Sequence, residues 1–250
     1  MTPHGIGVVL RGVRKGYGEQ AVLRGVDLDV GPGELLAIVG QSGTGKSVLL
    51  RQIVGLERPD AGTIIVGELP LERYLALPPG EKPFRIAMVF QGSALLASLT
   101  VAENVALRLR EHEARPEADV ATIVGRVLAQ VELGGSDAKL PAELSGGMRK
   151  RVAIARALAV DPELILYDEP TADLDPILTE QIAALFRRIG TERGATQVIV
   201  THNLPLARSI ADRIAVLDGG RIVECSTPAE LGRSSHALTR EFLRAAALGT

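Results

Sequence analysis

One stretch decides the fold of this chain: Gly40-Gln41-Ser42-Gly43-Thr44-Gly45-Lys46-Ser47. It follows the compact apolar run Leu35 to Val39, which predicts a buried strand, and it leads into a predicted helix from about Gly45 to Val54. Glycines at this spacing let backbone N–H groups turn inward around phosphate oxygens at the helix N-terminus. The sequence therefore predicts a phosphate-binding loop in which Lys46 reaches the β- and γ-phosphates and Ser47 ligates Mg²⁺.

Two adjacent acids, Asp168 and Glu169, end a second apolar run, Leu164 to Tyr167. Carboxylates at the end of a buried strand are costly to fold unless they act on a ligand. We expect Asp168 to hold Mg²⁺, directly or through water, and Glu169 to polarise the water that attacks a phosphate. The alternative reading, an ordinary turn signalled by Pro170, has little force beside the phosphate loop.

The apolar pattern of the remaining chain predicts an α/β core. Alternating residues up to Val30, interrupted by glycines, predict short antiparallel strands with one solvated face. Asp218-Gly219-Gly220 predicts a hairpin near the end. A largely parallel sheet, covered on one face by a helix over about Thr179 to Ile189, is expected from buried strands at Leu35 to Val39, Ile86 to Val89, Leu164 to Tyr167, Val198 to Val200 and Ile214 to Leu217.

The segment between Thr100 and Asp161 has no strand signal. Apolar residues fall on helical stripes there, so we expect an all-helical insertion into the core. Within it, Leu144-Ser145-Gly146-Gly147-Met148 precedes a helical run. Ser145 is a predicted N-cap, and the two glycines leave N–H groups free at the positive end of that helix, which indicates a second anion site. The basic residues Arg149-Lys150-Arg151 on the same helix are predicted to lie on a solvated face.

Composition excludes several classes of protein. Lys and Arg number 28 against 30 Asp and Glu, a net charge of −2, so no global basic field draws in nucleic acid. A single cysteine, Cys225, excludes an internal disulfide and fits a reducing compartment. The longest apolar runs are too short to cross a bilayer, so the chain is expected to be soluble by itself.

These elements, in this order, resemble those of the ABC ATPase family. The matching motifs are the aromatic loop at Tyr17, Walker A at Gly40 to Ser47, the Q-loop at Gln91, the signature at Ser145-Gly146-Gly147, Walker B at Asp168-Glu169, the D-loop at Asp175 and the switch at His202. The resemblance implies one domain over residues 1–250. A nucleotide-binding core with an antiparallel β subdomain is expected at about 1–97 and 162–250, and a helical signature subdomain at about 98–161.

The same resemblance implies roles for individual residues. Catalysis is expected from Glu169, His202, Gln91 and Lys46, and Mg²⁺ ligation from Ser47, Gln91 and Asp168. ATP is expected to contact Tyr17, Gly40, Gln41, Ser42, Gly43, Thr44, Gly45, Lys46, Ser47 and Val48, together with Ser145, Gly146, Gly147 and Asp175. The family arrangement is a homodimer that holds two ATP molecules, each between the Walker A loop of one copy and the signature of the other.

Three positions depart from the usual family pattern: Met148 ends the signature in place of Gln, Asp173 replaces Ala and Asn203 replaces Asp. None removes a charge or donor assigned above. The stretch from Met88 to Glu111, together with Met148, resembles the ATPases of Mla-type and Mce-type lipid transporters. Importers of betaine-like solutes share that Met, so an ATPase of an importer for a small solute such as betaine or amino acids is the alternative. The short stretch after the hairpin disfavours it, because such importers usually carry a C-terminal regulatory domain.

Partners and location also follow from the lipid-transporter resemblance. It implies integral membrane permease subunits of the MlaE type, an MCE-domain protein and a small STAS-type regulatory protein, with no nucleic acid. The expected place is cytoplasmic, peripheral on the cytoplasmic face of the inner membrane. Leu95, Leu96 and Leu99, just after the Q-loop, are expected to form an exposed groove for a helix of the permease. In the alternative reading these leucines close the core of the insertion.

Overall fold

The structure, a computed structural model, describes residues 4–112 and 115–248. Its strands are β1 (Val8–Tyr17), β2 (Gln20–Val30), β3 (Leu35–Val39), β4 (Ala61–Val66), β5 (Leu69–Pro70), β6 (Ile86–Val89), β7 (Leu164–Asp168), β8 (Thr196–Thr201), β9 (Arg213–Asp218) and β10 (Arg221–Ser226). Its helices are α1 (Lys46–Ile53), α2 (Leu71–Ala76), α3 (Val101–His112), α4 (Glu117–Gln130), α5 (Gly146–Ala159), α6 (Pro176–Arg193), α7 (Leu204–Ile210), α8 (Pro228–Leu231) and α9 (Ala237–Leu248), with 3₁₀ turns η1 (Pro79–Glu81) and η2 (Pro141–Glu143).

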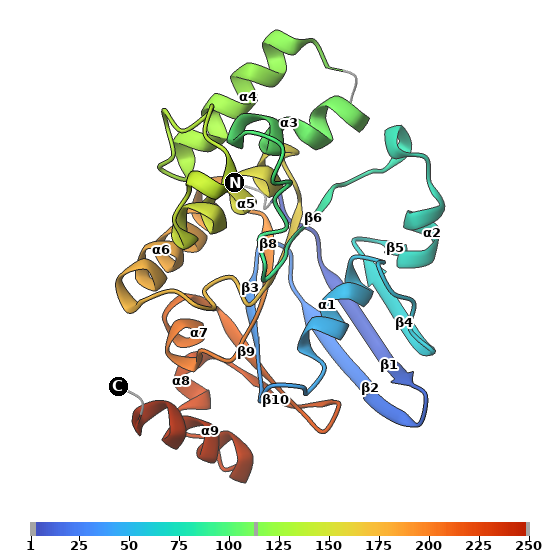
Figure 1. The fold of residues 1–250 in the computed structure, drawn as a ribbon. Coiled ribbons are helices and arrows are strands. Elements are labelled where there is room, and N and C mark those ends of the chain that lie inside the picture. Colours follow the sequence, from blue (N-terminus) through green and yellow to red (C-terminus); the bar gives the residue numbers. More distant parts are fainter. Residues whose placement is uncertain (1–3, 113–114, 249–250) are drawn as a thin grey trace.

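A six-stranded sheet in the order β10-β9-β3-β8-β7-β6 forms the centre of the molecule (Figure 1). Neighbouring strands from β9 to β6 run parallel, and β10 alone pairs antiparallel, through the Gly219-Gly220 hairpin. Because the strands run in one direction, their carboxyl ends meet at one edge of the sheet, where ligands bind in open α/β sheets. The predicted α/β class, with its parallel sheet and terminal hairpin, is confirmed.

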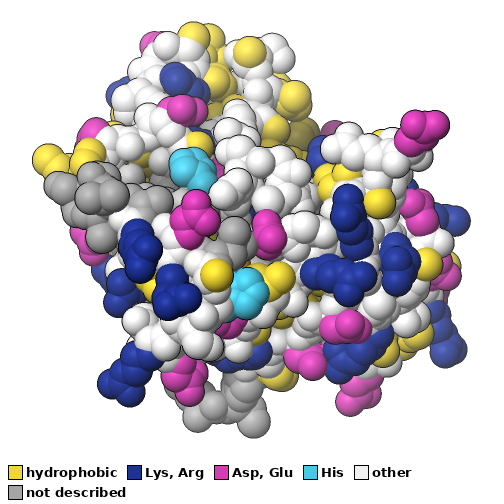
Figure 2. Space-filling model, turned by 90° about the horizontal axis from the view of Figure 1, so that it is seen from below, with side chains coloured by type: hydrophobic (Ala, Val, Ile, Leu, Met, Phe, Trp, Pro, Cys, Tyr) yellow, Lys and Arg dark blue, Asp and Glu magenta, His cyan; other side chains and the backbone are white. Residues whose placement is uncertain are grey.

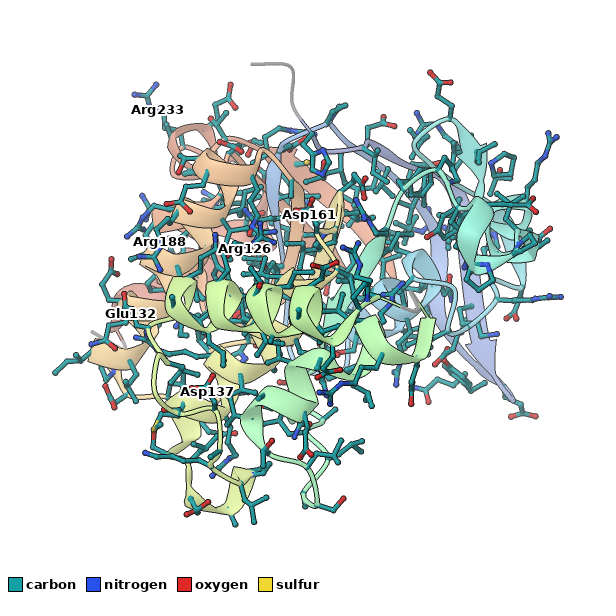
Figure 3. All side chains as sticks on the ribbon, turned by 90° about the horizontal axis from the view of Figure 1, so that it is seen from above. Arg126, Glu132, Asp137, Asp161, Arg188 and Arg233 are labelled. Atoms are coloured by element: carbon teal, nitrogen blue, oxygen red, sulfur yellow. The ribbon has the colours of Figure 1, made fainter. Side chains whose placement is uncertain are left out.

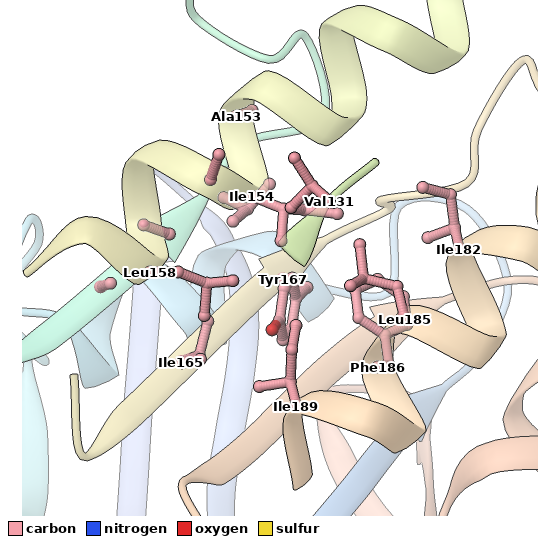
Figure 4. Close-up of a cluster of buried hydrophobic side chains, with 14 of the residues drawn as sticks. Val131, Ala153, Ile154, Leu158, Ile165, Tyr167, Ile182, Leu185, Phe186 and Ile189 are labelled. Carbon is pink, nitrogen blue, oxygen red and sulfur yellow. The ribbon is translucent and has the colours of Figure 1, made fainter. Parts of the chain in front are cut away.

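Strand β3 is buried along its whole length because the sheet is covered on both faces. Leu36 and Ile38 face a core shared with α1 and the first sheet, whereas Leu35, Ala37 and Val39 face a second core under the helices. Alternation across a doubly covered sheet produces a continuous apolar run in the sequence. Figure 4 shows part of the second core, where Tyr167 of β7 meets Phe186 of α6 beneath Ile154 of α5.

The first strands form a separate four-stranded sheet in the order β2-β1-β4-β5. Buried and exposed residues alternate along β1 and β2, as the sequence predicts for strands with one solvated face. The prediction of short strands is wrong: β1 has 10 residues and β2 has 11. Register shifts near Gly12 and Gly16 let one long bent pair continue where the glycines suggested breaks.

The segment 101–159 contains α3, α4 and α5, and none of its described residues lies in a strand. The predicted stripes are buried: Val101, Val105 and Leu109 on α3, and Val120, Val124 and Val127 on α4, with Val131 just beyond. These side chains pack into the same core as the helix-covered face of the central sheet. The insertion is therefore joined to the core by continuous apolar packing.

The solvated face predicted for Arg149-Lys150-Arg151 is wrong for two of its three residues. Arg149 is exposed, but Lys150 and Arg151 are buried and satisfied internally. Arg151 donates to the carbonyl oxygen of Val131 at 3.0 Å and to the Glu132 carboxylate at 2.6 Å. Glu132 also lies 3.7 Å from Arg188 of α6, and Figure 3 shows these last two side chains facing each other. A helical pattern of charges does not reveal such pairing, because the acceptors come from distant segments.

The face of the molecule seen from below in Figure 2 has basic and acidic side chains interspersed, rather than a field of one sign. This distribution agrees with the near-zero net charge. Within the described ranges, every helix is too short or too polar to traverse a lipid bilayer.

The core packing predicts the effect of substitutions on α6. Phe186 is fully buried, its ring centroid 4.5 Å from that of Tyr167. Phe186→Ala should lower the free energy of unfolding by about 3–5 kcal/mol, through lost burial and the cavity left behind. Urea denaturation followed by circular dichroism measures this loss. Ile177→Ala on the same helix is the matched control, because Ile177 is 74% exposed and should cost under about 0.5 kcal/mol.

Candidate functional site

The loop between β3 and α1 has the shape that its glycines allow. A Cβ at Gly40 would collide with the carbonyl oxygen of Leu217 on β9, so only glycine fits there. Gly45 has a φ of 101°, a left-handed conformation that favours glycine. Thr44 closes the turn by donating through Oγ1 to the carbonyl oxygen of Gln41 at 2.9 Å. The loop thus lies against β9 at the carboxyl edge of the sheet.

Lys46 begins α1, and its ammonium points back into this loop. Nζ donates to the carbonyl oxygens of Gly40 and Gln41 at 2.9 and 3.0 Å, and it lies 4.0 Å from the Glu169 carboxylate. Burial lowers the pKa of Lys46, an effect opposed by the nearby carboxylates of Glu169 and Asp168. A buried cation held by neutral carbonyls at the helix N-terminus suits phosphate oxygens, which would supply the missing negative charge.

Ser47 and Asp168 are brought together across 121 positions of sequence. The Ser47 hydroxyl donates to Asp168 Oδ1 at 2.7 Å. Burial raises the pKa of Asp168, whereas the Ser47 hydrogen bond lowers it. A hydroxyl beside a buried carboxylate, next to a phosphate loop, is an oxygen donor set that fits Mg²⁺. No group of three or more His, Cys, Asp or Glu side chains forms a metal site in the described part of the chain, so further ligands would come from phosphate, water or Gln91.

Glu169 follows directly, and its carboxylate is oriented by His202. His202 Nδ1 lies 3.0 Å from Glu169 Oε2, and the backbone N–H of His202 donates to the same oxygen at 3.3 Å. Glu169 has a φ of 44°, unusual for a residue with a side chain, and its own N–H donates to the carbonyl oxygen of Val200 on β8. The side chain of Glu169 is 12% exposed, and that of His202 is 62% exposed. The pair therefore places a base at the mouth of the site.

Gln91 lies at the end of β6, on the same edge of the sheet. Its side chain is exposed, and its backbone carbonyl accepts a hydrogen bond from the buried Lys150 of α5. Desolvation lowers the pKa of Lys150, and the acids Asp173, Glu169 and Asp168 oppose that shift. Lys150, which the sequence predicts to be solvated, thus connects the end of β6 to the helical insertion.

A cavity of about 430 Å³ gathers nine of the predicted site residues. Its lining includes Ser42, Gly43, Gly45, Lys46, Ser47, Val48, Gln91, Glu169 and His202. Gly40, Gln41 and Thr44 do not line it and instead shape the loop behind it. Sequence reasoning missed two lining residues, Val22 and Arg51. The period of α1 could have found Arg51, because it lies four residues after Ser47 on the same helix face.

The predicted signature and D-loop residues are absent from this cavity's lining. Ser145 caps α5 as predicted, accepting a hydrogen bond from the N–H of Met148 at 3.3 Å. Asp175 caps α6, accepting from the N–H of Leu178 at 2.9 Å. Gly147 packs near Leu178, so the two helix starts are neighbours. Ser145, Gly146 and Asp175 are exposed and lie outside the lining of the cavity around Lys46, which leaves them available to another molecule.

Tyr17 likewise does not line the cavity. It ends β1 with 46% of its surface exposed, and its hydroxyl donates to the Glu57 carboxylate. That hydrogen bond raises the pKa of Tyr17. Glu57 in turn lies 3.1 Å from Nε of Arg51, which does line the cavity. The aromatic ring is therefore connected to the cavity wall through two charged side chains.

Known proteins of similar sequence and structure have been compared with this chain. The family model described as ABC transporter matches residues 23–172. A probable ribonucleotide transport ATP-binding protein, mkl of Mycobacterium leprae, is 37% identical over 247 residues, which cover 99% of this chain and 71% of that protein. The L-cystine transport system ATP-binding protein TcyN of Escherichia coli is 42% identical over 237 residues, 92% of this chain and 94% of that protein.

Two further matches extend the range of relatives. The sulfate/thiosulfate import ATP-binding protein CysA of Mycobacterium tuberculosis is 42% identical over 239 residues, 95% of this chain and 66% of that protein. Among solved structures, a dimeric, post-hydrolysis state of the ATP-binding cassette MJ0796 bound to ADP and Pi aligns with a TM-score of 0.78 at 34% identity. That alignment covers 88% of this chain and 98% of the other.

The contacts of Lys46 predict how its removal affects ligand binding. Lys46→Ala removes the buried cation of the phosphate loop, so ATP affinity should fall roughly tenfold or more, as expected for a lost charged contact. Isothermal titration with ATP measures this change. Lys139→Ala, which removes an exposed lysine elsewhere, should leave the affinity unchanged. Equal affinities for both variants would contradict the role of Lys46.

Proposed function

Because this chain belongs to the family of ABC transporter ATP-binding proteins, and so binds and hydrolyses ATP for a transporter, we propose that its transporter moves phospholipids or related lipids. The observation that carries the lipid assignment is the stretch from Met88 to Glu111 with the Met148 ending of the signature, which resembles Mla-type and Mce-type ATPases. The named relatives above transport ribonucleotides, L-cystine or sulfate, so their names do not supply this substrate.

In the proposed reaction, a water molecule attacks the γ-phosphorus of ATP. The bond from that phosphorus to the bridging oxygen of ADP breaks, leaving ADP and phosphate. Glu169 accepts the proton of the water, and His202, 3.0 Å away, holds the carboxylate in place. Lys46 turns from the loop carbonyls to the phosphates. Ser47 and Asp168, with Gln91, would hold Mg²⁺, which supplies positive charge to the phosphate oxygens.

We infer that a second copy of the chain completes each nucleotide site. The support is the position of Ser145 and Gly146, exposed at the start of α5 and outside the cavity around Lys46. A helix N-terminus with free N–H groups binds phosphate. In a homodimer, the signature of one copy would face the phosphate loop of the other. The related cassette MJ0796 has been solved as a dimer, which agrees with this inference.

The loop after Gln91 is the proposed contact with the permease. Its shape is fixed by Asn104, a fully buried residue of α3. Asn104 Oδ1 accepts from the N–H of Leu96 at 2.8 Å, and Nδ2 donates to the carbonyl oxygens of Leu96, Leu99 and Thr100 at 2.9–3.1 Å. A loop held this way presents its outer side chains in a fixed position, which suits docking of a helix.

The expectation of three exposed leucines in this loop is wrong for two of them. Leu96 is 46% exposed, whereas Leu99 is half-buried and Leu95 packs against the core that the insertion shares with the central sheet. The exposure expected for a groove is therefore seen at Leu96, and the burial expected in the alternative is seen at Leu95. Leu96 is the residue proposed to contact the permease.

The remaining partners belong to the same proposal. They are MlaE-type permease subunits in the inner membrane, with the chain peripheral on its cytoplasmic face, an MCE-domain protein and a STAS-type protein. The competing candidate is the ATPase of a small-solute importer, favoured by the 42% identity to TcyN over 94% of that protein. Both candidates share the ATPase chemistry and differ in cargo.

The position of Glu169 predicts the effect of its amide. Glu169→Gln keeps the size of the side chain but removes the base, so steady-state phosphate release should fall by a factor on the order of 10² to 10⁴ while ATP still binds. ATP should then hold the variant as a dimer, measured by light scattering. Near-native turnover would refute the role of Glu169, and a monomer at every ATP concentration, with or without permease, would refute the shared site.

Leu96 separates docking from catalysis. Leu96→Asp places a charge on the exposed apolar contact, so permease co-purification should be lost while the chain stays folded and binds ATP. Leu56→Asp is the control, since Leu56 is 59% exposed but outside this loop. Cells lacking the protein, or carrying only Leu96→Asp, should show altered envelope lipid distribution with normal solute uptake. Normal lipid distribution with lost osmolyte or amino-acid uptake would support the solute importer instead.

A further inference from the structure

A second cavity, of about 640 Å³, lies between the loop that follows α2 and helix α3. It shares no lining residue with the nucleotide cavity. Its walls come from η1 and the residues up to Arg85 on one side and from Arg108 of α3 on the other, so it spans the core and the helical insertion. Ligand cavities typically measure about 300–1,000 Å³.

Three cations and one acid line this cavity: Lys82, Arg85, Arg108 and Glu163. Glu163 is committed to Arg85. Its Oε2 accepts from the backbone N–H of Arg85 at 2.7 Å, and its Oε1 lies 3.5 Å from the Arg85 guanidinium. Glu163 therefore balances the charge of Arg85 and leaves Lys82 and Arg108 without a carboxylate partner.

Lys82 and Arg108 have only neutral partners among the described residues. Arg108 Nη1 donates to the carbonyl oxygen of Ile86 at 3.1 Å. Lys82 Nζ lies 4.7 Å from the centroid of the Tyr74 ring. Among the described residues, the ion pairs within 4.0 Å include that of Arg85 with Glu163 but none of Lys82 or Arg108. Two uncompensated positive charges facing one cavity repel each other, and an anion between them would remove that cost.

The walls place Lys82 against an ordered aromatic surface before any ligand binds. The Tyr74 ring is buried and stacked on Phe84, with centroids 4.5 Å apart and planes inclined by 2°, and its hydroxyl donates to the carbonyl oxygen of Phe84 at 3.0 Å. The ammonium of Lys82 lies over this ring. Pro79 and Pro83 restrict the backbone on either side of Lys82. Part of the conformational entropy of Lys82 is therefore already lost before a ligand binds.

We propose that this cavity is a second anion site, which binds a phosphomonoester with the phosphate between Lys82 and Arg108. A phosphomonoester carries close to two negative charges at neutral pH, which matches the two uncompensated cations. A monocarboxylate would neutralise only one. The cavity has room for the organic part beside the prolines. Because Lys82 belongs to the core and Arg108 to the insertion, the bound ligand would link the two and stabilise their relative position.

The phosphate could belong to a soluble metabolite or to a lipid headgroup, and two arms of one experiment distinguish these sources. With the nucleotide cavity filled by a non-hydrolysable ATP analogue, the full-length chain is titrated calorimetrically with glycerol 3-phosphate. In the second arm, the chain is floated with vesicles of equal parts phosphatidic acid and phosphatidylcholine, against vesicles of phosphatidylcholine alone. Binding in the first arm only identifies a soluble ligand, and binding to the acidic vesicles identifies a headgroup.

Lys82→Ala and Arg108→Ala should each weaken the binding about tenfold or more. Arg233→Ala is the matched control, an exposed arginine on the opposite side of the molecule from α2 (Figure 3), and it should bind as the native chain does. Lys82 makes no hydrogen bond to the described chain, so its variant tests the site even if Arg108→Ala loosens the contact to β6. The proposal is overturned if the native chain binds neither probe, or if both variants bind unchanged. ATP turnover by Glu169 is tested separately, and this result does not depend on the lipid assignment.

Discussion

The hydrogen bond from Ser47 to Asp168 joins the phosphate loop to the acidic pair, and it exists only because β3 and β7 run parallel in one sheet. Strand β8 lies between them and pairs in parallel with both, which brings their carboxyl ends to one edge. The phosphate loop leaves one strand there, and the acidic pair ends the other. An antiparallel arrangement would place Asp168 at the far edge, and no change of side chains could restore the contact.

The helical insertion is connected to that edge by two basic residues of α5, the buried Lys150 and the half-buried Arg156. Lys150 donates to the carbonyl oxygen of Gln91, and Arg156 donates to the carbonyl oxygens of Ser93 and Ala94 at 2.8 and 2.6 Å. Burial lowers the pKa of Arg156, because desolvation disfavours the charged guanidinium. The helix that begins at Ser145 thus also holds the loop after Gln91. The segment expected to sense the γ-phosphate and the one expected to meet the second copy are parts of one packed unit.

Positive charge in this protein is distributed among separate tasks. Lys46 is held by carbonyls of the phosphate loop, Lys150 and Arg156 fix the loop after Gln91, and Arg151 and Arg188 share Glu132 at the contact between α5 and α6. Lys82 and Arg108 differ from all of these. They line a separate cavity, and among the described residues neither is paired with a carboxylate or with a carbonyl of the loops around the nucleotide cavity. The net charge of −2 conceals these local excesses.

The sequence alone determined the α/β class, the phosphate loop, the acidic pair and the helix cap at Ser145. Each of these is local: a glycine spacing, an apolar run that ends in acids, or a capping residue three positions before its donor. Only the tertiary structure decided which predicted residues share a cavity. It separated Tyr17, Ser145 and Asp175 from Lys46, added Val22 and Arg51, and buried Lys150 and Arg151. Those outcomes depend on partners tens of residues away, and a periodic pattern along one helix contains no information about what packs against it.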